Sequence, residues 1–268
     1  MKTSLAKLPS PVLAGVVKER NAAAAIAEAK NCLIHGAKML DLHLSHLEKT
    51  DVETLRTVIS AMKLPVLALH YPMADSTITE EERIDSFRRA VEAGAAGIDI
   101  QGYSFHTPSK AGFCGEDKYS FTKGNPKEVV TDESIIAKQC ELIDWAHSKG
   151  AEVLLSCHTG IPMTCEQIVD LVQFMEKRNP DIIKIVTPAN DEAQMLEALK
   201  TMITLKKEIK TPVSYHASGA AGALTRVLNP VLGGHIVFCV DGYNEYSTME
   251  QVDLETAKSI IDNIFKIL

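Results

Sequence analysis

The chain has 268 residues, of which 46% are hydrophobic and 24% are charged. These proportions are typical of a globular protein. The formal net charge of −7 argues against nucleic acid and against an anionic membrane surface as partners. The six cysteines show no CxxC or zinc-type spacing, which indicates a reducing compartment. No segment approaches the roughly 20 apolar residues that a membrane span needs, so we expect a cytoplasmic protein.

Short β-type runs alternate with amphipathic stretches eight times along the chain. The expected strands cover residues 11–17, 38–44, 65–70, 97–101, 152–158, 182–187, 212–216 and 235–240. The expected helices cover residues 21–35, 51–62, 80–93, 133–148, 164–177, 191–207, 222–228 and 252–268. Strands that alternate with helices form a parallel sheet, and eight repeats at this length predict an α/β protein with a closed (β/α)8 TIM barrel. We expect one domain over residues 1–268.

The segment after the fourth expected strand breaks this alternation. Residues 102–132 are rich in glycine, lysine and serine, and they contain five aromatic residues: Tyr103, Phe105, Phe113, Tyr119 and Phe121. Loops this long inside a compact domain are usually functional or disordered, and disordered segments are poor in aromatic residues. We expect this insertion to form a lid over the mouth of the barrel. An oligomer contact or a surface excursion is the alternative.

Polar residues gather at the carboxyl ends of the expected strands, where barrels of this kind carry their active sites. Side chains alternate along a strand, so Asp41 and His43 point the same way, and so do Asp99 and Gln101. Four of the nine histidines lie at strand ends, which indicates a functional cluster. In chain order, the strand-end residues are Asp41, His43, His70, Asp99, Gln101, His158, Lys184, His216 and Asp241.

Lys184 interrupts the apolar strand of residues 181–187. An ammonium group buried there must find a partner or lose its charge, and a neutral amine forms Schiff bases with ketones and aldehydes. His158 ends the preceding strand, and an imidazole moves protons at neutral pH. The pair suggests covalent imine catalysis. The structural alternatives are a Lys184 that faces the helices and a His158 that only bonds the backbone.

These residues resemble motifs of the type I 3-dehydroquinate dehydratases. Ser156-Cys-His158 and Asp181-Ile-Ile-Lys184-Ile-Val resemble the Ser-x-His and Asp-Ile-Val-Lys-Ile-Ala elements of that family. Farther on, Gly222-Ala-Leu-Thr-Arg226 resembles Gly-Val-Ile-Ser-Arg, and Ser247-Thr-Met-Glu-Gln251 resembles Ser-Ala-Pro-Gly-Gln. The similarity extends through most of the chain and is strongest from about residue 151 onward.

The resemblance implies a lyase of the shikimate pathway, which supplies aromatic amino acid biosynthesis. Its substrate would be 3-dehydroquinate or a related cyclic hydroxy keto acid, and no metal or organic cofactor would be needed. Lys184 would form the imine, His158 would transfer the proton, and Arg226 would bind the substrate carboxylate. Ser247 and Gln251 would lie on a loop that covers the substrate. By analogy with the family, a homodimer is one expectation.

The first half of the chain departs from the family pattern. The family has Glu-x-Arg on strand two, an arginine at the end of strand three, Asp-x-Glu on strand four and methionines on strand seven. Here the strand-four glutamate is replaced by Gln101, which we expect to orient His158. We therefore expect a rebuilt substrate pocket, comprising Asp41, His43, His70 and His216.

Three other classes of function stay open from the residues alone. A metal-dependent hydrolase or isomerase would use Asp41, His43, His70, His158 and His216 as ligands for zinc or manganese. A Schiff-base aldolase would bind a sugar phosphate at residues 218–222, where a helix begins. A barrel that binds a ligand without catalysis is the third alternative.

Overall fold

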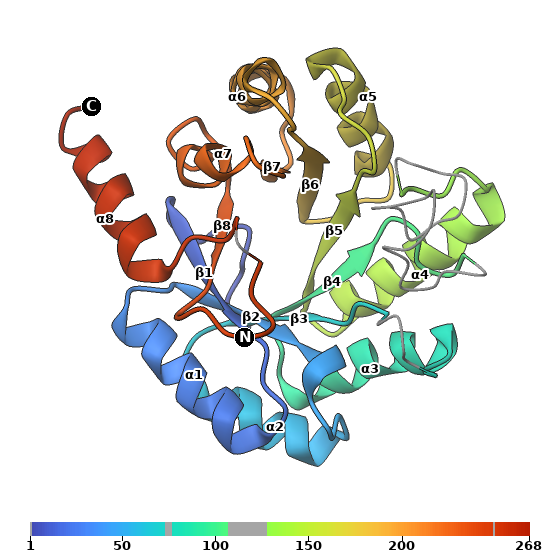
Figure 1. Ribbon diagram of the computed structural model, residues 1–268. Coiled ribbons are helices and arrows are strands. Elements are labelled where there is room, and N and C mark those ends of the chain that lie inside the picture. Colours follow the sequence, from blue (N-terminus) through green and yellow to red (C-terminus); the bar gives the residue numbers. More distant parts are fainter. Residues whose placement is uncertain (1, 73–76, 107–127, 249) are drawn as a thin grey trace.

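A computed structural model describes residues 2–72, 77–106, 128–248 and 250–268, and in them eight strands alternate with eight α-helices around a barrel (Figure 1). The strands are β1 (Val12–Val17), β2 (Met39–His43), β3 (Val66–Leu69), β4 (Gly97–Gln101), β5 (Glu152–His158), β6 (Ile182–Pro188), β7 (Val213–Ser218) and β8 (Ile236–Cys239). The helices are α1 (Ala22–Ile34), α2 (Val52–Ala61), α3 (Glu80–Ala93), α4 (Glu133–Ser148), α5 (Cys165–Glu176), α6 (Glu192–Glu208), α7 (Ala223–Leu228) and α8 (Leu254–Phe265). A short 3-10 helix, η1 (Leu44–His46), follows β2. The predicted (β/α)8 fold is confirmed.

The eight strands form one parallel sheet with the order β7-β6-β5-β4-β3-β2-β1-β8. The seam of this nearly closed barrel lies between β7 and β8, which form no regular ladder. There the amide of His235 donates to the carbonyl of Val213 at 2.9 Å, and the hydroxyl of Ser214 donates to the carbonyl of Ile236. The buried hydroxyl of Ser214 therefore helps to join β7 to β8. This role explains why a polar residue lies inside β7.

Seven of the eight α-helices begin at an Asn, Asp or Thr whose side-chain oxygen accepts a backbone amide of the first turn. Such a cap fixes where a helix starts, because it satisfies an amide that has no partner within the helix. The caps are Asn21, Asp51, Thr79, Asp132, Thr164, Asp191 and Asp253. None of the helices in the described ranges is both long and apolar enough to cross a membrane.

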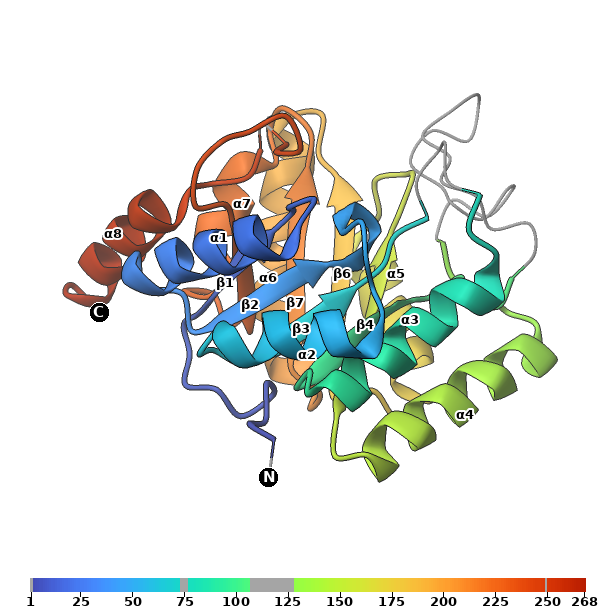
Figure 2. The ribbon, with the colours of Figure 1, turned by 90° about the horizontal axis from the view of Figure 1, so that it is seen from below.

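The barrel is filled in two layers. One cluster of buried side chains lies between strands and helices, and a second one fills the interior and includes Met39, Leu67, Leu154 and Phe238. Leu5 joins this interior cluster, so the N-terminal segment closes the barrel at the amino ends of the strands. Figure 2 shows this segment at the end of the barrel opposite the arrowheads of β6 and β7. The amino end of the barrel is therefore closed, and a ligand would have to enter from the carboxyl ends of the strands.

The expected lid over residues 102–132 falls mostly outside the described residues, because residues 107–127 are not among them. Its described ends are tied to the barrel. The amide of Val130 donates to the carbonyl of Gly102 at 3.0 Å, and the side-chain amide of Gln139 donates to the carbonyl of Ser104 at 2.8 Å. The insertion thus starts and finishes at fixed points beside β4 and α4, and its function as a lid stays a prediction.

Candidate active site

A cavity of about 710 Å³ opens at the carboxyl ends of the strands. Its volume is within the range that small-molecule sites occupy. Of the ten residues predicted to form the site, seven line this cavity: Asp41, His43, His158, Lys184, His216, Arg226 and Gln251. Three others, His70, Gln101 and Ser247, do not line it.

Lys184 projects from β6 into the cavity and does not face the helices. Its side chain is only 7% exposed, and its Nζ lies 3.7 Å from Oδ2 of Asp99 on β4. The Phe238 ring covers the amine from β8, with Nζ 4.2 Å from the ring centroid. Among the described residues, the amine thus lies beside the carboxyl group of Asp99 and an aromatic face, and it lines the cavity.

Asp99 is the buried partner of this amine. Burial raises the pKa of the Asp99 carboxyl to about 7, while Lys184 and the hydroxyl of Ser156 act in the opposite direction. The Ser156 hydroxyl donates to Oδ1 at 2.6 Å, whereas Oδ2 has no hydrogen bond from any residue that the structure describes. A carboxyl group that titrates near neutrality can accept the proton that an ammonium must release before it attacks a carbonyl carbon.

His158 ends β5 next to Lys184. In the β5–β6 ladder Ser156 pairs with Lys184 and His158 pairs with Val186, so the imidazole stands one layer above the amine. Burial, followed by the positive charges of Lys184 and Arg226, holds the pKa of His158 well below its usual 6.5. The imidazole is therefore neutral at pH 7 and able to act as a base.

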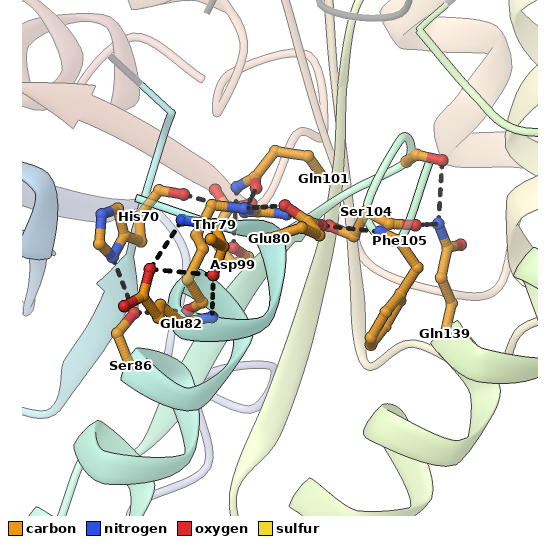
Figure 3. Close-up of polar contacts among 12 residues, drawn as sticks. His70, Thr79, Glu80, Glu82, Ser86, Asp99, Gln101, Ser104, Phe105 and Gln139 are labelled. Atoms are coloured by element: carbon orange, nitrogen blue, oxygen red, sulfur yellow. Dashed lines mark hydrogen bonds and ion pairs between the residues drawn. The ribbon is translucent and has the colours of Figure 1, made fainter. Parts of the chain in front are cut away.

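Gln101 does not reach His158 among the described contacts. Its side-chain oxygen accepts a hydrogen bond from Arg83 of α3, and its side-chain amide donates to the carbonyl of Asp99 at 2.9 Å. Figure 3 shows Gln101 within the polar network around α3, and Gln101 is not among the residues that line the cavity. The structure therefore separates Gln101 from the imidazole that we expected it to orient.

Arg83 organises this network behind the site. Its guanidinium group donates to both carboxylate oxygens of Glu80, at 2.6 and 2.7 Å, and to the hydroxyl of Ser104 at 2.9 Å. Glu80 in turn accepts the amide of Phe105 at 2.7 Å, as Figure 3 shows. The arginine is 1% exposed, so its charge requires these partners. Gln101 thus belongs to the anchor of the segment that follows β4.

At the end of β3, His70 does not face the cavity as we expected. His70 faces α3, where its Nδ1 lies 2.7 Å from the hydroxyl of Ser86. The next residue, Tyr71, lines the cavity and lies against His158. Since Leu67 belongs to the interior cluster, the alternation of β3 also directs Leu69 and Tyr71 inward. If the inward-facing residues of β3 are counted in steps of two from Leu67, Tyr71 and not His70 points into the cavity.

Arg226 reaches the cavity from α7, which is packed closely on β7. A Cβ atom at Gly222 would lie 2.6 Å from the carbonyl oxygens of Ala217 and Ser218, so only glycine allows this approach. The hydroxyl of Thr225 accepts the amide of Ala217 at 2.8 Å and fixes the helix. The guanidinium of Arg226 is 90% or more buried, and its Nε has no hydrogen-bond partner in the described structure. It is thus available to an anionic ligand.

The opposite wall of the cavity comes from β1 and β2. Asp41 and His43 point inward together, with Nε2 of His43 3.3 Å from Oδ2 of Asp41. Burial opposes ionisation of Asp41, but His43, Lys184 and Lys18 outweigh it and lower the pKa of this carboxyl. Its Oδ1 is buried without a hydrogen bond. This wall therefore offers a free acceptor to a hydroxyl group of a ligand.

The sequence did not lead us to predict Lys18 as a site residue. It follows β1, lines the cavity, and donates from Nζ to the carbonyl of Tyr246 at 3.0 Å. Burial lowers its pKa, and Lys184 and Arg226 contribute in the same direction. Its position directly after an apolar strand was the signal that would have found it, since the other strand-end polar residues were selected in that way.

The segment after β8 closes one side of the cavity. Gln251 lines the cavity, and its side-chain oxygen accepts the amide of Thr248 at 3.2 Å. Ser247 instead bonds within the turn, where its hydroxyl accepts the amide of Asn244 at 3.0 Å. Gln251 is thus positioned to contact a ligand, whereas Ser247 holds the shape of its own turn.

Two findings bear on the alternative functions. Within the described ranges, no group of three or more His, Cys, Asp or Glu residues is arranged to hold a metal ion. At the expected phosphate site, the amide of Gly219 donates to the carboxylate of Glu250 at 3.2 Å. The segment leads into α7, which has only six residues. An anionic side chain therefore already uses the amide that a phosphate would need.

The fold and the site define a (β/α)8 barrel with a buried amine and a neutral imidazole at its mouth. The chain belongs to the type I 3-dehydroquinase family, whose model matches residues 127–267, just over half of the chain. The 3-dehydroquinate dehydratase of Desulfotalea psychrophila is 24% identical over 230 residues, which cover 85% of this chain and 87% of that relative.

Solved structures agree with this assignment at the level of the fold. Type I 3-dehydroquinate dehydratase from Clostridium difficile, with covalently modified comenic acid, has a TM-score of 0.77 at 16% identity. The match covers 96% of this chain and 93% of that one. The 3-dehydroquinate dehydratase from Geobacillus kaustophilus has a TM-score of 0.77 at 13% identity, over 99% and 97% of the two chains.

Proposed function

We propose that this protein is a Schiff-base-forming dehydratase that eliminates water from 3-dehydroquinate or a related cyclic hydroxy keto acid. The observation that carries the proposal is the buried amine of Lys184, which lies beside Asp99 and lines one cavity together with His158 and Arg226. Membership of the type I 3-dehydroquinase family supports the same reaction.

In the proposed reaction, the neutral amine of Lys184 attacks the ring ketone, and water leaves as the imine forms. Asp99 takes up the proton that the ammonium group must first release. His158 then removes a proton from the carbon beside the protonated imine, so that a C=C bond forms while the electron pair of the C=N bond moves onto nitrogen. His158 returns this proton to the departing hydroxyl group, so the second C–O bond breaks and water leaves. Hydrolysis of the new imine gives a conjugated enone and regenerates the amine.

Arg226 would hold the substrate carboxylate and so fix the ring against the base. The free Oδ1 of Asp41 would accept a hydrogen bond from a ring hydroxyl on the opposite wall. A cyclic keto acid with hydroxyl groups thus matches the charges at both ends of the cavity. The cytoplasmic setting and the homodimer stay predictions.

Covalent trapping tests the function directly. The protein is incubated with 3-dehydroquinate, reduced with borohydride, and examined by intact mass and peptide mapping, while enone formation is followed by absorbance. We expect enone formation and one reduced adduct, on the peptide that contains Lys184 and not on the peptide that contains Lys18. An adduct on Lys18, or no adduct together with no enone, would contradict the proposal.

We expect two different pH dependences for the two halves of the reaction. Imine formation should weaken as the pH falls through about 7, because protonated Asp99 can no longer accept the amine's proton. Proton exchange in the imine complex, before reduction, should persist below pH 6.5, because the pKa of His158 lies well below that value. The rate of borohydride trapping reports the first step, and deuterium uptake from solvent per trapped site reports the second. Exchange that is already lost at pH 6.5 would show an ordinary imidazole.

A further inference from the structure

Tyr71 is the side chain that contacts the imidazole of His158. Its hydroxyl oxygen lies 3.1 Å from Nδ1 and 3.3 Å from Nε2, and the two ring centroids are 5.5 Å apart. In the described part of the chain, no carboxylate is recorded against this imidazole. The side chain that we expected to orient it, Gln101, is bonded to Arg83 instead. Among the described residues, Tyr71 is thus the candidate for orienting His158.

A general base needs a defined tautomer. A neutral imidazole has one N–H group and one lone pair, and the lone pair must face the carbon that loses its proton. The other nitrogen then carries hydrogen and needs an acceptor, since a ring without a fixed partner can rotate away from the substrate. The phenol oxygen of Tyr71 lies within hydrogen-bonding distance of both ring nitrogens and is nearer to Nδ1, the nitrogen to which we assign the hydrogen.

The surroundings of Tyr71 hold it in place and keep it uncharged. Its ring lies 6.2 Å from that of His43 and so stands between the β2 and β5 histidines. Burial, with contributions from nearby acidic groups that include Asp99, raises the pKa of Tyr71 well above 10. The side chain therefore remains a phenol, whose oxygen keeps lone pairs for the imidazole N–H.

We propose that Tyr71 is the positioning residue for His158: its phenol oxygen accepts the imidazole N–H and so aims the other nitrogen at the substrate carbon. This role rests on the proposed dehydratase function. It assigns to a residue at the end of β3 the task that the sequence suggested for Gln101 on β4. Once His158 has taken the proton, the same hydrogen bond becomes charge-assisted and stabilises the imidazolium until the proton passes to the leaving hydroxyl.

The test is Tyr71→Phe, which removes only the hydroxyl group. Imine formation needs Lys184 and not His158, so we expect borohydride trapping with 3-dehydroquinate to reach at least the wild-type level, because a slower onward reaction lets the imine accumulate. Deuterium uptake from solvent into the substrate, measured per trapped site, should fall by roughly 10- to 100-fold, as expected when a base loses its alignment. The KM should change much less than kcat.

Tyr215→Phe is the matched control, because it removes a buried phenol hydroxyl that contacts Thr187 at 2.9 Å and does not line the cavity. We expect this variant to keep its exchange rate per trapped site, even where its stability falls. Unchanged exchange in Tyr71→Phe would overturn the positioning role, and so would an equal fall in trapping and exchange, because that would place Tyr71 in binding. If the wild type itself forms no imine, that result contradicts the proposed dehydratase function itself and not only the role of Tyr71.

Discussion

Replacement of Lys184 by methionine is expected to lower kcat by roughly 10⁴- to 10⁶-fold, the scale on which enzymes lose activity without their nucleophile. The imine supplies the electron sink for proton removal, so no other side chain of the cavity can substitute for it. Borohydride should then trap no adduct at this position. Turnover is measured as enone formation from 3-dehydroquinate, and the adduct by intact mass.

The Lys184→Met variant is expected to fold. Removal of one partner from a buried ion pair is costly where the other must stay charged, but Asp99 can take up a proton. Burial already raises its pKa to about 7 against the opposing effect of Lys184, and without the lysine the carboxyl is neutral at pH 7. Its hydrogen bond from Ser156 remains possible. Thermal unfolding should therefore show a cooperative transition.

Lys18→Met is the matched control, since Lys18 is the other lysine of the cavity. Its adduct should still map to Lys184, because among the described residues Lys18 has no carboxyl partner at hydrogen-bonding distance and donates instead to the carbonyl of Tyr246. If Lys184→Met retained turnover while Lys18→Met lost it, the nucleophile would be Lys18.

The fold could be predicted well because its signals are local. Each strand is a short apolar run, and a capping side chain stands at or next to the start of seven of the eight α-helices. The expected bounds of strands and helices consequently agree with the observed ones to within about three residues. The order of the strands follows from the right-handed connection of each β-α-β unit.

The candidate site could be predicted only where a residue's role depends on its own strand. Lys184 and His158 end up in one cavity because they occupy neighbouring strands of the barrel. Gln101 could not be placed, because its direction is set by Arg83, a buried residue of α3 whose partners lie at the end of β3 and at the end of β4. Such a network between distant segments leaves no local pattern in the sequence.

Position 70 shows a different limit. His70 and Tyr71 are adjacent, and a histidine at a strand end is the stronger chemical signal. Which of the two faces the cavity depends on the parity of β3, and a shift of one residue exchanges the two faces of a strand. The interior position of Leu67 fixes this parity, but that position becomes known only when the strand is packed against its neighbours.

Replacement of His158 by glutamine is expected to leave the imine intact and to slow its onward reaction by roughly 10²- to 10⁴-fold, the usual contribution of a general acid–base group. Because the amine of Lys184 still attacks the ketone, the imine should accumulate. The fraction of protein trapped by borohydride during turnover should therefore rise, while deuterium uptake per trapped site falls.

The matched variant is His216→Gln, because the cavity contains a second histidine at the same level. Val186 of β6 pairs with His158 on one side and with His216 on the other, so the two imidazoles flank one residue. Both line the cavity, and burial lowers the pKa of both well below 6.5. Their charge state at pH 7 therefore cannot distinguish them as bases.

Their hydrogen-bond partners do distinguish them. His158 has the phenol of Tyr71 against its ring, whereas no hydrogen bond to the ring of His216 is recorded among the described residues. We therefore expect His216→Gln to raise the KM and to keep proton exchange within about 10-fold of the wild type, since it removes a contact without removing the base. Exchange that is lost in His216→Gln and kept in His158→Gln would assign the proton transfer to β7. It would also leave the contact between Tyr71 and His158 without a catalytic purpose.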